Sequence, residues 1–318
     1  MKIPPRLRPF LVCAALVGLP LPAADLAPVD AAEFARCLPT DAKVERLATG
    51  FGFTEGPVWL PREGILVFSD IPRDQILRWS PAGGIAPFRE PSRNANGNTL
   101  DLQGRLLTCE HSGRRVARRE ADGTLVTVVD RFEGRRLNSP NDVVVKADGT
   151  LWFTDPEYGL KTNPATKQRE GKEQPGNFVY RYDPATGTTT AVVRDFVQPN
   201  GLAFSPDEKL LYVADSGAPR HIRVFAVGAD GRLDAGRVFC RLDQGGPDGI
   251  RVDRQGRVWS SSGDGVQVFH PEGRLVGRIL LPESAANLCF GGPDGKTLYI
   301  TARKSLYAVR TSVTGAGR

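Results

Sequence analysis

The sequence is poor in histidine and cysteine and has no long apolar run after its first 25 residues. Only three histidines occur in 318 residues, and no Gly-x-Ser-x-Gly motif is present, which argues against a serine triad on a nucleophile turn. The cysteines are too widely and irregularly spaced for a zinc-binding pattern. No segment beyond residue 25 is long and apolar enough to span a bilayer.

Positive charge is in modest excess and is not concentrated in one stretch. The formal charge of +6 falls to +3 when the three basic residues near the N-terminus, Lys2, Arg6 and Arg8, are left out. Local basic pairs such as Arg114-Arg115 and Arg135-Arg136 suit solvated sheet edges better than a phosphate track. We therefore expect no nucleic-acid partner.

Residues 1–24 have the features of a signal peptide, and residues 25–318 are expected to form a single domain. The signal contains the three basic residues, then an apolar run at residues 10–21, then the small residues Ala23 and Ala24. This pattern predicts export to the periplasm or the medium, with no membrane contact after cleavage. An uncleaved membrane anchor is the alternative, although the run is short for a span.

Four cysteines remain in the predicted mature chain: Cys37, Cys109, Cys240 and Cys289. An exported compartment permits disulfides, with three possible connectivities. Buried free thiols are equally compatible with the sequence. Glycine and proline are abundant, at 35 and 25 residues, and this turn-rich balance suits many short strands better than long helices.

Six apolar β-type segments recur along the chain, and most follow a turn rich in Gly, Asp or Pro. The segments are residues 65–70, 106–110, 151–155, 211–215, 258–261 and 298–301. The intervals between them, 40 to 60 residues, are typical of propeller blades. The sequence therefore predicts an all-β fold, a six-bladed β-propeller with four-stranded blades around a central channel.

Ring closure would place the two chain ends in one blade, with residues 43–47 beside residues 305–309. The longest interval contains a polar, charged stretch at residues 161–176, which indicates an exposed loop. A β-sandwich is the alternative fold, but it does not explain the common register of the repeats.

Four short acid or amide turns precede the apolar segments. They are Thr54-Glu55-Gly56-Pro57, Ser139-Pro140-Asn141-Asp142, Gln198-Pro199-Asn200-Gly201 and Gly246-Pro247-Asp248-Gly249. In each turn the acid or amide residue lies 14 or 15 residues before the end of the second strand. Counting back 14 or 15 residues from the ends of the second strands in the other two repeats gives Asn96 and Asn287. All six oxygen-bearing side chains should therefore surround one axis.

Glu55, Asn141, Asn200 and Asp248 offer two carboxylates and two amide oxygens. Hard oxygen donors favour Ca²⁺ or Mg²⁺ over Zn²⁺, and Ca²⁺ accepts enough oxygens to leave positions for water or substrate. We expect one divalent cation, best suited to Ca²⁺, with Mg²⁺, Mn²⁺ or Zn²⁺ as alternatives. Ordinary turns are the competing interpretation because Asn and Asp are common turn formers, but Glu55 is a poor turn residue.

The four turns together resemble the signatures of the senescence marker protein (regucalcin), gluconolactonase and luciferin-regenerating enzyme family. The matching segments are Glu55-Gly56-Pro57-Val58-Trp59, Pro140-Asn141-Asp142, Pro199-Asn200-Gly201-Leu202 and Pro247-Asp248-Gly249-Ile250. The resemblance runs from about Val44 to Val309 and is strongest to exported bacterial gluconolactonases, through residues 137–143 and 153–156. Members of the family are six-bladed propellers.

The resemblance implies that Glu55, Asn141, Asn200 and Asp248 bind a divalent metal and that Asp248 is catalytic. It implies metal-dependent hydrolysis of a sugar lactone, in which the metal polarises the lactone carbonyl and Asp248 activates water. Covalent attack by Asp248 is the competing route. Regucalcin-like members have an arginine at the position of Ser139, so substrate contacts are expected to differ in this chain. The candidate substrate-binding residues are Asn96, His111 and Asn287.

Two other functions fit the same residues. Diisopropyl fluorophosphatase has a similar propeller and ligand set, so hydrolysis of another ester or a phosphoester is one alternative. A non-enzymatic propeller that binds calcium or another ligand is the second. The expected partner is a small-molecule lactone, and the expected assembly state is a monomer or a weak oligomer.

Overall fold

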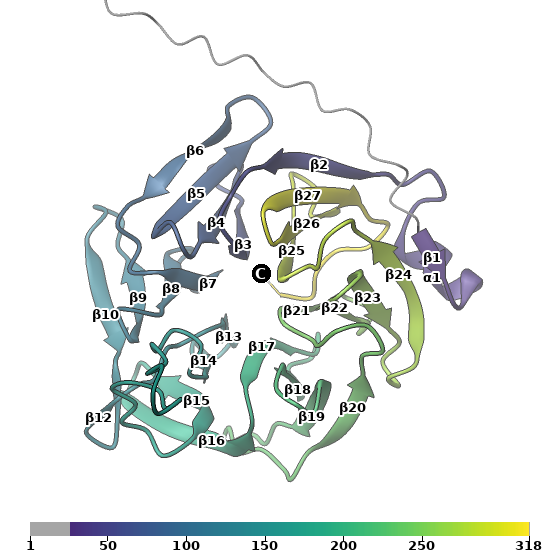
Figure 1. Ribbon diagram of the computed structural model, residues 1–318. Coiled ribbons are helices and arrows are strands. Elements are labelled where there is room, and N and C mark those ends of the chain that lie inside the picture. Colours follow the sequence, from purple (N-terminus) through teal and green to yellow (C-terminus); the bar gives the residue numbers. More distant parts are fainter. Residues whose placement is uncertain (1–25, 318) are drawn as a thin grey trace, which may run out of the picture.

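The computed structural model describes residues 26–317. These residues form six antiparallel sheets arranged as blades around a central axis, and the inner strand of each blade lies nearest that axis (Figure 1). The predicted six-bladed β-propeller is confirmed. The predicted signal peptide, residues 1–24, lies outside the described residues.

Each of the first four blades contains four strands, which follow one another from the inner edge outward. The first blade contains β3 (Thr54–Leu60), β4 (Ile65–Asp70), β5 (Gln75–Ser80) and β6 (Gly84–Arg89), and the second contains β7 (Ala95–Leu100), β8 (Leu106–Glu110), β9 (Arg115–Arg119) and β10 (Leu125–Val129). A short ribbon of β11 (Arg131–Phe132) and β12 (Arg135–Arg136) follows. The third blade contains β13 (Val143–Val145), β14 (Leu151–Asp155), β15 (Asn177–Asp183) and β16 (Thr188–Phe196), and the fourth contains β17 (Pro199–Phe204), β18 (Leu210–Asp215), β19 (His221–Ala226) and β20 (Arg237–Arg241).

The last two blades contain the segments that close the ring. The fifth contains β21 (Ile250–Val252), β22 (Val258–Ser262), β23 (Gly265–Phe269) and β24 (Leu275–Leu280), and it gains a fifth, outer strand in β1 (Leu26–Pro28). The sixth contains β25 (Asn287–Gly291), β26 (Thr297–Ala302) and β27 (Ser305–Arg310), and β2 (Val44–Thr49) completes it. Val44 pairs with Val309, so the predicted closure by both chain ends is confirmed.

The predicted second strands agree with the structure to within one residue at each end. The agreement is close because the turns before these strands contain residues that favour tight turns. Before β14, for example, Gly149 has a positive φ of 85°, a conformation that glycine adopts without steric cost. The carboxylate of Asp148 accepts a 2.9 Å hydrogen bond from the backbone N–H of Thr150 in the same turn. The apolar run Leu151–Asp155 that follows is buried along its whole length.

The core lies between neighbouring blades. Trp152 of the third blade is fully buried and meets Phe204 of the fourth edge-on, with ring centroids 5.5 Å apart. Trp259 of the fifth blade meets Phe290 of the sixth in the same way, at 5.4 Å. Such edge-to-face contacts add to the burial of apolar area, so each blade is held by its neighbours rather than by a core of its own.

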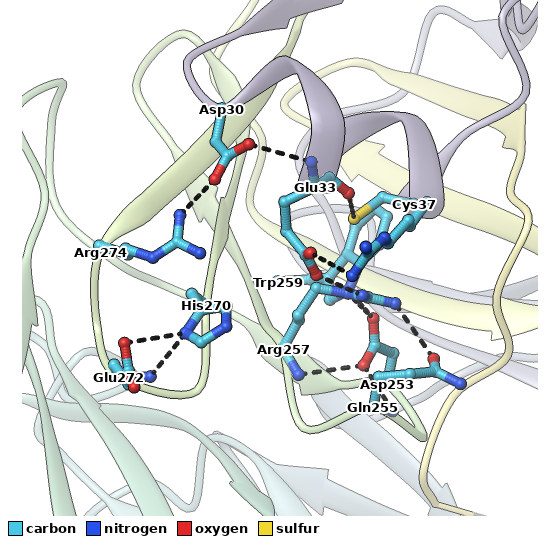
Figure 2. A network of polar contacts seen from close by, with 11 residues as sticks. Asp30, Glu33, Cys37, Asp253, Gln255, Arg257, Trp259, His270, Glu272 and Arg274 are labelled. Carbon is cyan, nitrogen blue, oxygen red and sulfur yellow. Dashed lines mark hydrogen bonds and ion pairs between the residues drawn. The ribbon is translucent and has the colours of Figure 1, made fainter.

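The N-terminal segment is attached to the fifth blade. Helix α1 (Ala31–Cys37) begins at Asp30, whose carboxylate accepts the backbone N–H of Glu33 at 3.0 Å. Glu33 accepts a 2.7 Å hydrogen bond from Arg257, and Arg257 also pairs with Asp253 at 2.7 Å (Figure 2). The Arg257 side chain is only 4% exposed, so this network fixes the helix against the blade. The sequence did not predict this extra strand and helix.

The four cysteines of the described chain, Cys37, Cys109, Cys240 and Cys289, are buried free thiols. The choice between disulfides and thiols, which the sequence left open, is thus decided in favour of thiols. Of the helices that the structure describes, none is long and apolar enough to cross a membrane.

Candidate active site

The six oxygen-bearing residues lie at or just before the start of the six inner strands, at one end of the central channel. Glu55, Asn96, Asn200 and Asn287 belong to β3, β7, β17 and β25, while Asn141 and Asp248 precede β13 and β21 by two residues. Asp248 is partly exposed, and the other five side chains are 2% to 4% exposed. Contacts between neighbouring blades bring all six together, as the sequence predicted.

The ring is narrow because glycines follow several of these residues. Gly97 donates its backbone N–H to the Asn141 carbonyl at 2.8 Å, and a Cβ on this glycine would lie 2.5 Å from the same oxygen. A Cβ on Gly249 would lie 2.1 Å from the side chain of Asn287. Only glycine permits such close approach of one inner strand to the next. The Glu-Gly, Asn-Gly and Asp-Gly pairs therefore set the diameter of the site.

Buried aspartates at the ends of three second strands hold the loops that lead into the site. Asp155 accepts hydrogen bonds of 2.7 and 2.8 Å from the backbone N–H groups of Asn138 and Ser139, just before Asn141. Asp70 and Asp215 bind the equivalent loops ahead of Glu55 and Asn200. In these three blades the contact accounts for the step of 14 or 15 residues, because each aspartate must reach the loop of its own blade.

Glu55 is held by the sixth blade. Its Oε2 accepts a 2.9 Å hydrogen bond from Nδ2 of Asn287 and another from the Gly56 N–H at 2.6 Å. Burial raises the pKa of Glu55 to about 7, and the nearby charge of Asp142 adds to this effect. In the absence of a cation, ionisation of this buried carboxylate therefore costs free energy.

Asn200 and Asp248 each present a buried oxygen without a hydrogen-bond partner in the described chain, the Oδ1 atom in both cases. The Asn200 amide is oriented by Nδ2, which donates to Ser216 Oγ at 2.9 Å. Burial and the negative charges of Glu55 and Asp142 raise the pKa of Asp248 well above its ordinary value. Unpaired buried oxygens beside a second carboxylate are what a cation would satisfy.

The donor set fits a hard divalent cation. Within residues 26–317 no group of three or more His, Cys, Asp or Glu side chains forms a metal cluster. The candidate ligands are instead two carboxylates and two amides, from Glu55, Asn141, Asn200 and Asp248. Oxygen donors of this kind favour Ca²⁺ or Mg²⁺.

Asn96 and His111 form a pair beside the candidate ligands. Nδ2 of Asn96 lies 3.1 Å from Nε2 of His111, and since an amide nitrogen only donates, Nε2 is the unprotonated ring nitrogen. Burial lowers the pKa of His111 to about 4, so the imidazole is neutral near pH 7. Oδ1 of Asn96 is buried and has no partner in the described chain, which leaves one acceptor for a ligand.

Four further residues belong to the site and were not predicted from the sequence. Asp142 is fully buried, and its Oδ2 lies 3.3 Å from NH1 of Arg251, which joins the third and fifth blades beneath the candidate ligands. Ser216 orients Asn200, and Tyr158 lies near Ser216 and Asp248. Asp142 is the last residue of one predicted turn and Arg251 lies two residues after another, so a signal for both was present in the sequence. Nothing in the local sequence marks Tyr158 or Ser216.

Comparison with known proteins agrees with this geometry. Residues 53–304 match the family model described as the SMP-30/Gluconolactonase/LRE-like region. The chain is 33% identical to a gluconolactonase of Zymomonas mobilis over 304 residues, which cover 87% of this chain and 84% of that protein. It is 30% identical to a pentonolactonase of Haloferax volcanii over 256 residues, covering 78% and 80%.

A solved structure of a gluconolactonase from Xanthomonas campestris is also similar. It superposes with a TM-score of 0.82 at 38% sequence identity, covering 92% of this chain and 99% of the other. The family match covers most of the chain and includes all six ring residues. The chain therefore belongs to the SMP-30, gluconolactonase and LRE-like family.

Proposed function

We propose that this protein is a lactonase that hydrolyses a sugar lactone and depends on one divalent cation held by Glu55, Asn141, Asn200 and Asp248. The observation that carries the proposal is the pair of unpartnered buried oxygens on Asn200 and Asp248, next to the carboxylate of Glu55. The relatives named as gluconolactonase and pentonolactonase support the lactone class.

Calcium is the cation that we propose, because two carboxylates and two neutral amides supply oxygen ligands and leave room for others. When bound, such a cation supplies Lewis-acid polarisation of the lactone carbonyl. The exported location predicted by the N-terminal signal remains part of the proposal. Fractionation of the native host, followed by N-terminal sequencing of the mature protein, tests it.

Asp248 is the residue that we propose as the general base. It is the only ring residue that is partly exposed, so water and substrate reach it. One of its two carboxylate oxygens can bind the cation, and the other can accept the proton of the attacking water. His111 is unsuited to this role, because burial lowers its pKa to about 4 and Nε2 faces Asn96.

The proposal is tested by hydrolysis of glucono-δ-lactone with the purified mature protein. Turnover should disappear on chelation and return when Ca²⁺, Mg²⁺, Mn²⁺ or Zn²⁺ is restored, which also identifies the usable ion. Asp248→Asn should lower kcat at least about 100-fold, the usual range for a lost general base, without lowering the free energy of unfolding in the absence of cation. Asp195→Asn, on an exposed side chain of the third blade, is the matched control.

The outcome against the proposal is a folded, cation-binding protein that hydrolyses no lactone. The two roles of Asp248 are separated by a single turnover in heavy-oxygen water. Label that appears in Asp248 itself would indicate covalent attack rather than general-base catalysis.

A further inference from the structure

We propose that Tyr158, on the turn that follows β14, is a specificity-determining residue whose hydroxyl forms a hydrogen bond with a hydroxyl group of the sugar lactone. The inference rests on the proposed lactonase function and deepens it. Three separate contacts place the turn, residues 156–159, over the candidate active site.

Ser139 anchors the turn to the third blade. Its Oγ donates to the carbonyl of Pro156 at 2.7 Å and accepts the backbone N–H of Gly159 at 3.0 Å. Ser139 is fully buried and lies two residues before the candidate ligand Asn141. The turn is therefore fixed at both ends to the loop that carries a ligand.

Gly159 packs the turn against the wall of the site. A Cβ at this position would lie 2.5 Å from Cβ of His111 and 2.8 Å from Cβ of Ser139. No larger residue fits in so small a space without a shift of the turn. The residue next to Tyr158 is thus in direct contact with the Asn96–His111 pair of the second blade.

Glu157 ties the other side of the turn to the fourth blade. Its Oε1 accepts a hydrogen bond from Nε2 of Gln198 at 3.4 Å, and its Oε2 accepts one from Nζ of Lys172 at 2.6 Å. Gln198 lies two residues before the candidate ligand Asn200. Tyr158 is therefore held between the ligand loops of the third and fourth blades.

The Tyr158 side chain remains accessible although its neighbours are buried. The residue is 40% exposed, whereas Asn141 and Asn200 are 4% and 3% exposed. Burial of the phenol, together with the charge of nearby Asp248, raises the pKa of Tyr158 to about 12, so its proton is retained. An aromatic side chain with a polar tip suits a polyhydroxylated ring.

The hydroxyl of Ser216 is a hydrogen-bond neighbour of the Tyr158 phenol. Oγ of Ser216 donates its own proton to the Pro247 carbonyl at 2.5 Å and accepts from Asn200 at 2.9 Å. The Ser216 proton is thus already used, so the phenol can act toward Ser216 only as a donor, to the second lone pair of Oγ. The lone pairs of the phenol oxygen then remain to accept a hydrogen bond from a sugar hydroxyl that enters the site.

The test compares glucono-δ-lactone with δ-valerolactone, which has the same ring and no hydroxyl groups. With Tyr158→Phe, we expect KM for glucono-δ-lactone to rise about three- to tenfold, the effect of one neutral hydrogen bond, with kcat within about twofold. The value of kcat/KM for δ-valerolactone should not change. Tyr182→Phe, in the outer part of the third blade, is the matched control, and Ser139→Ala should reproduce part of the KM effect.

The inference is overturned if Tyr158→Phe lowers kcat/KM equally for both lactones, or lowers it for neither. If the wild-type protein hydrolyses neither lactone, the proposed function fails separately. Calorimetric binding of gluconate to the calcium-loaded protein then replaces kinetics as the readout. Weaker binding to the Tyr158→Phe variant supports the role of the hydroxyl, and equal binding contradicts it.

Discussion

Asn287 donates a 2.9 Å hydrogen bond to Glu55 across the seam at which the propeller closes. The two residues are 232 positions apart, and they join the inner strand of the sixth blade to that of the first. A candidate metal ligand is therefore oriented by the last blade to be completed. The site and the closed ring depend on the same contact.

We expect Asn287→Leu to weaken both the ring and the site. The change keeps the volume but removes a donor from a buried carboxylate, and it should lower the free energy of unfolding by about 1–3 kcal/mol. Calcium affinity should fall as well, since Glu55 loses its fixed orientation. Urea unfolding and calorimetric titration measure the two effects. Gln168→Leu, at an exposed position in the loop after the third blade's second strand, is the control, and an unchanged affinity in Asn287→Leu would contradict the positioning role.

Calcium binding should be linked to pH through Glu55. Its pKa is raised from 4.5 to about 7, so the folded protein without cation binds more protons than the unfolded chain between these values. The free energy of unfolding of the cation-free protein should therefore fall as the pH rises through this window. Calcium affinity should rise over the same window because binding must release protons. Titrations at pH 5.5 and 8 in two buffers of different ionisation enthalpy measure the released protons, and an affinity independent of pH would refute the link.

The ring of oxygen-bearing residues was predictable in part because one structural cause repeats. Asp70, Asp155 and Asp215 each hold the loop before the candidate ligand of their blade, and this contact imposes a nearly constant sequence step. A repeated local constraint leaves a repeated spacing in the sequence. The second strands and the six axial residues could be located from this spacing, which is shared by the blades whose second strands end at Glu110, Ser262 and Ala302 without an aspartate.

The features that could not be predicted depend on contacts that do not repeat along the sequence. Tyr158 reaches the site only because Ser139 and Gly159 fix a turn whose sequence resembles any polar loop. Helix α1 lies against the fifth blade through Glu33 and Arg257, which are 224 residues apart. Nothing in a single sequence links such pairs, since each contact is made once and between distant segments.

The attachment of the N-terminal segment gives a third prediction. Glu33→Gln removes a charged partner from nearly buried Arg257 and should lower the free energy of unfolding by about 1–2 kcal/mol, with faster amide exchange in α1. Glu272→Gln is the control, because that side chain is 78% exposed in the same network (Figure 2). Equal exchange in both variants would show that α1 is held by apolar packing alone.

The last prediction concerns the pair beneath the site. Asp142 is fully buried and raises the pKa of both Glu55 and Asp248, while Arg251 offsets its charge from 3.3 Å. Arg251→Met leaves that carboxylate unpaired and should lower the free energy of unfolding by about 3–5 kcal/mol in the absence of cation.

Asp142→Asn leaves a charged guanidinium without its partner, and the double variant removes both charges. If the pair acts as one unit, the double variant should be more stable than Arg251→Met alone, with a coupling of more than about 1 kcal/mol. Calcium should stabilise Asp142→Asn less than the wild type, because one negative charge near the cation is lost. If the losses in the free energy of unfolding are additive, Asp142 and Arg251 act independently. The pair then does not control the charge of the site as a unit.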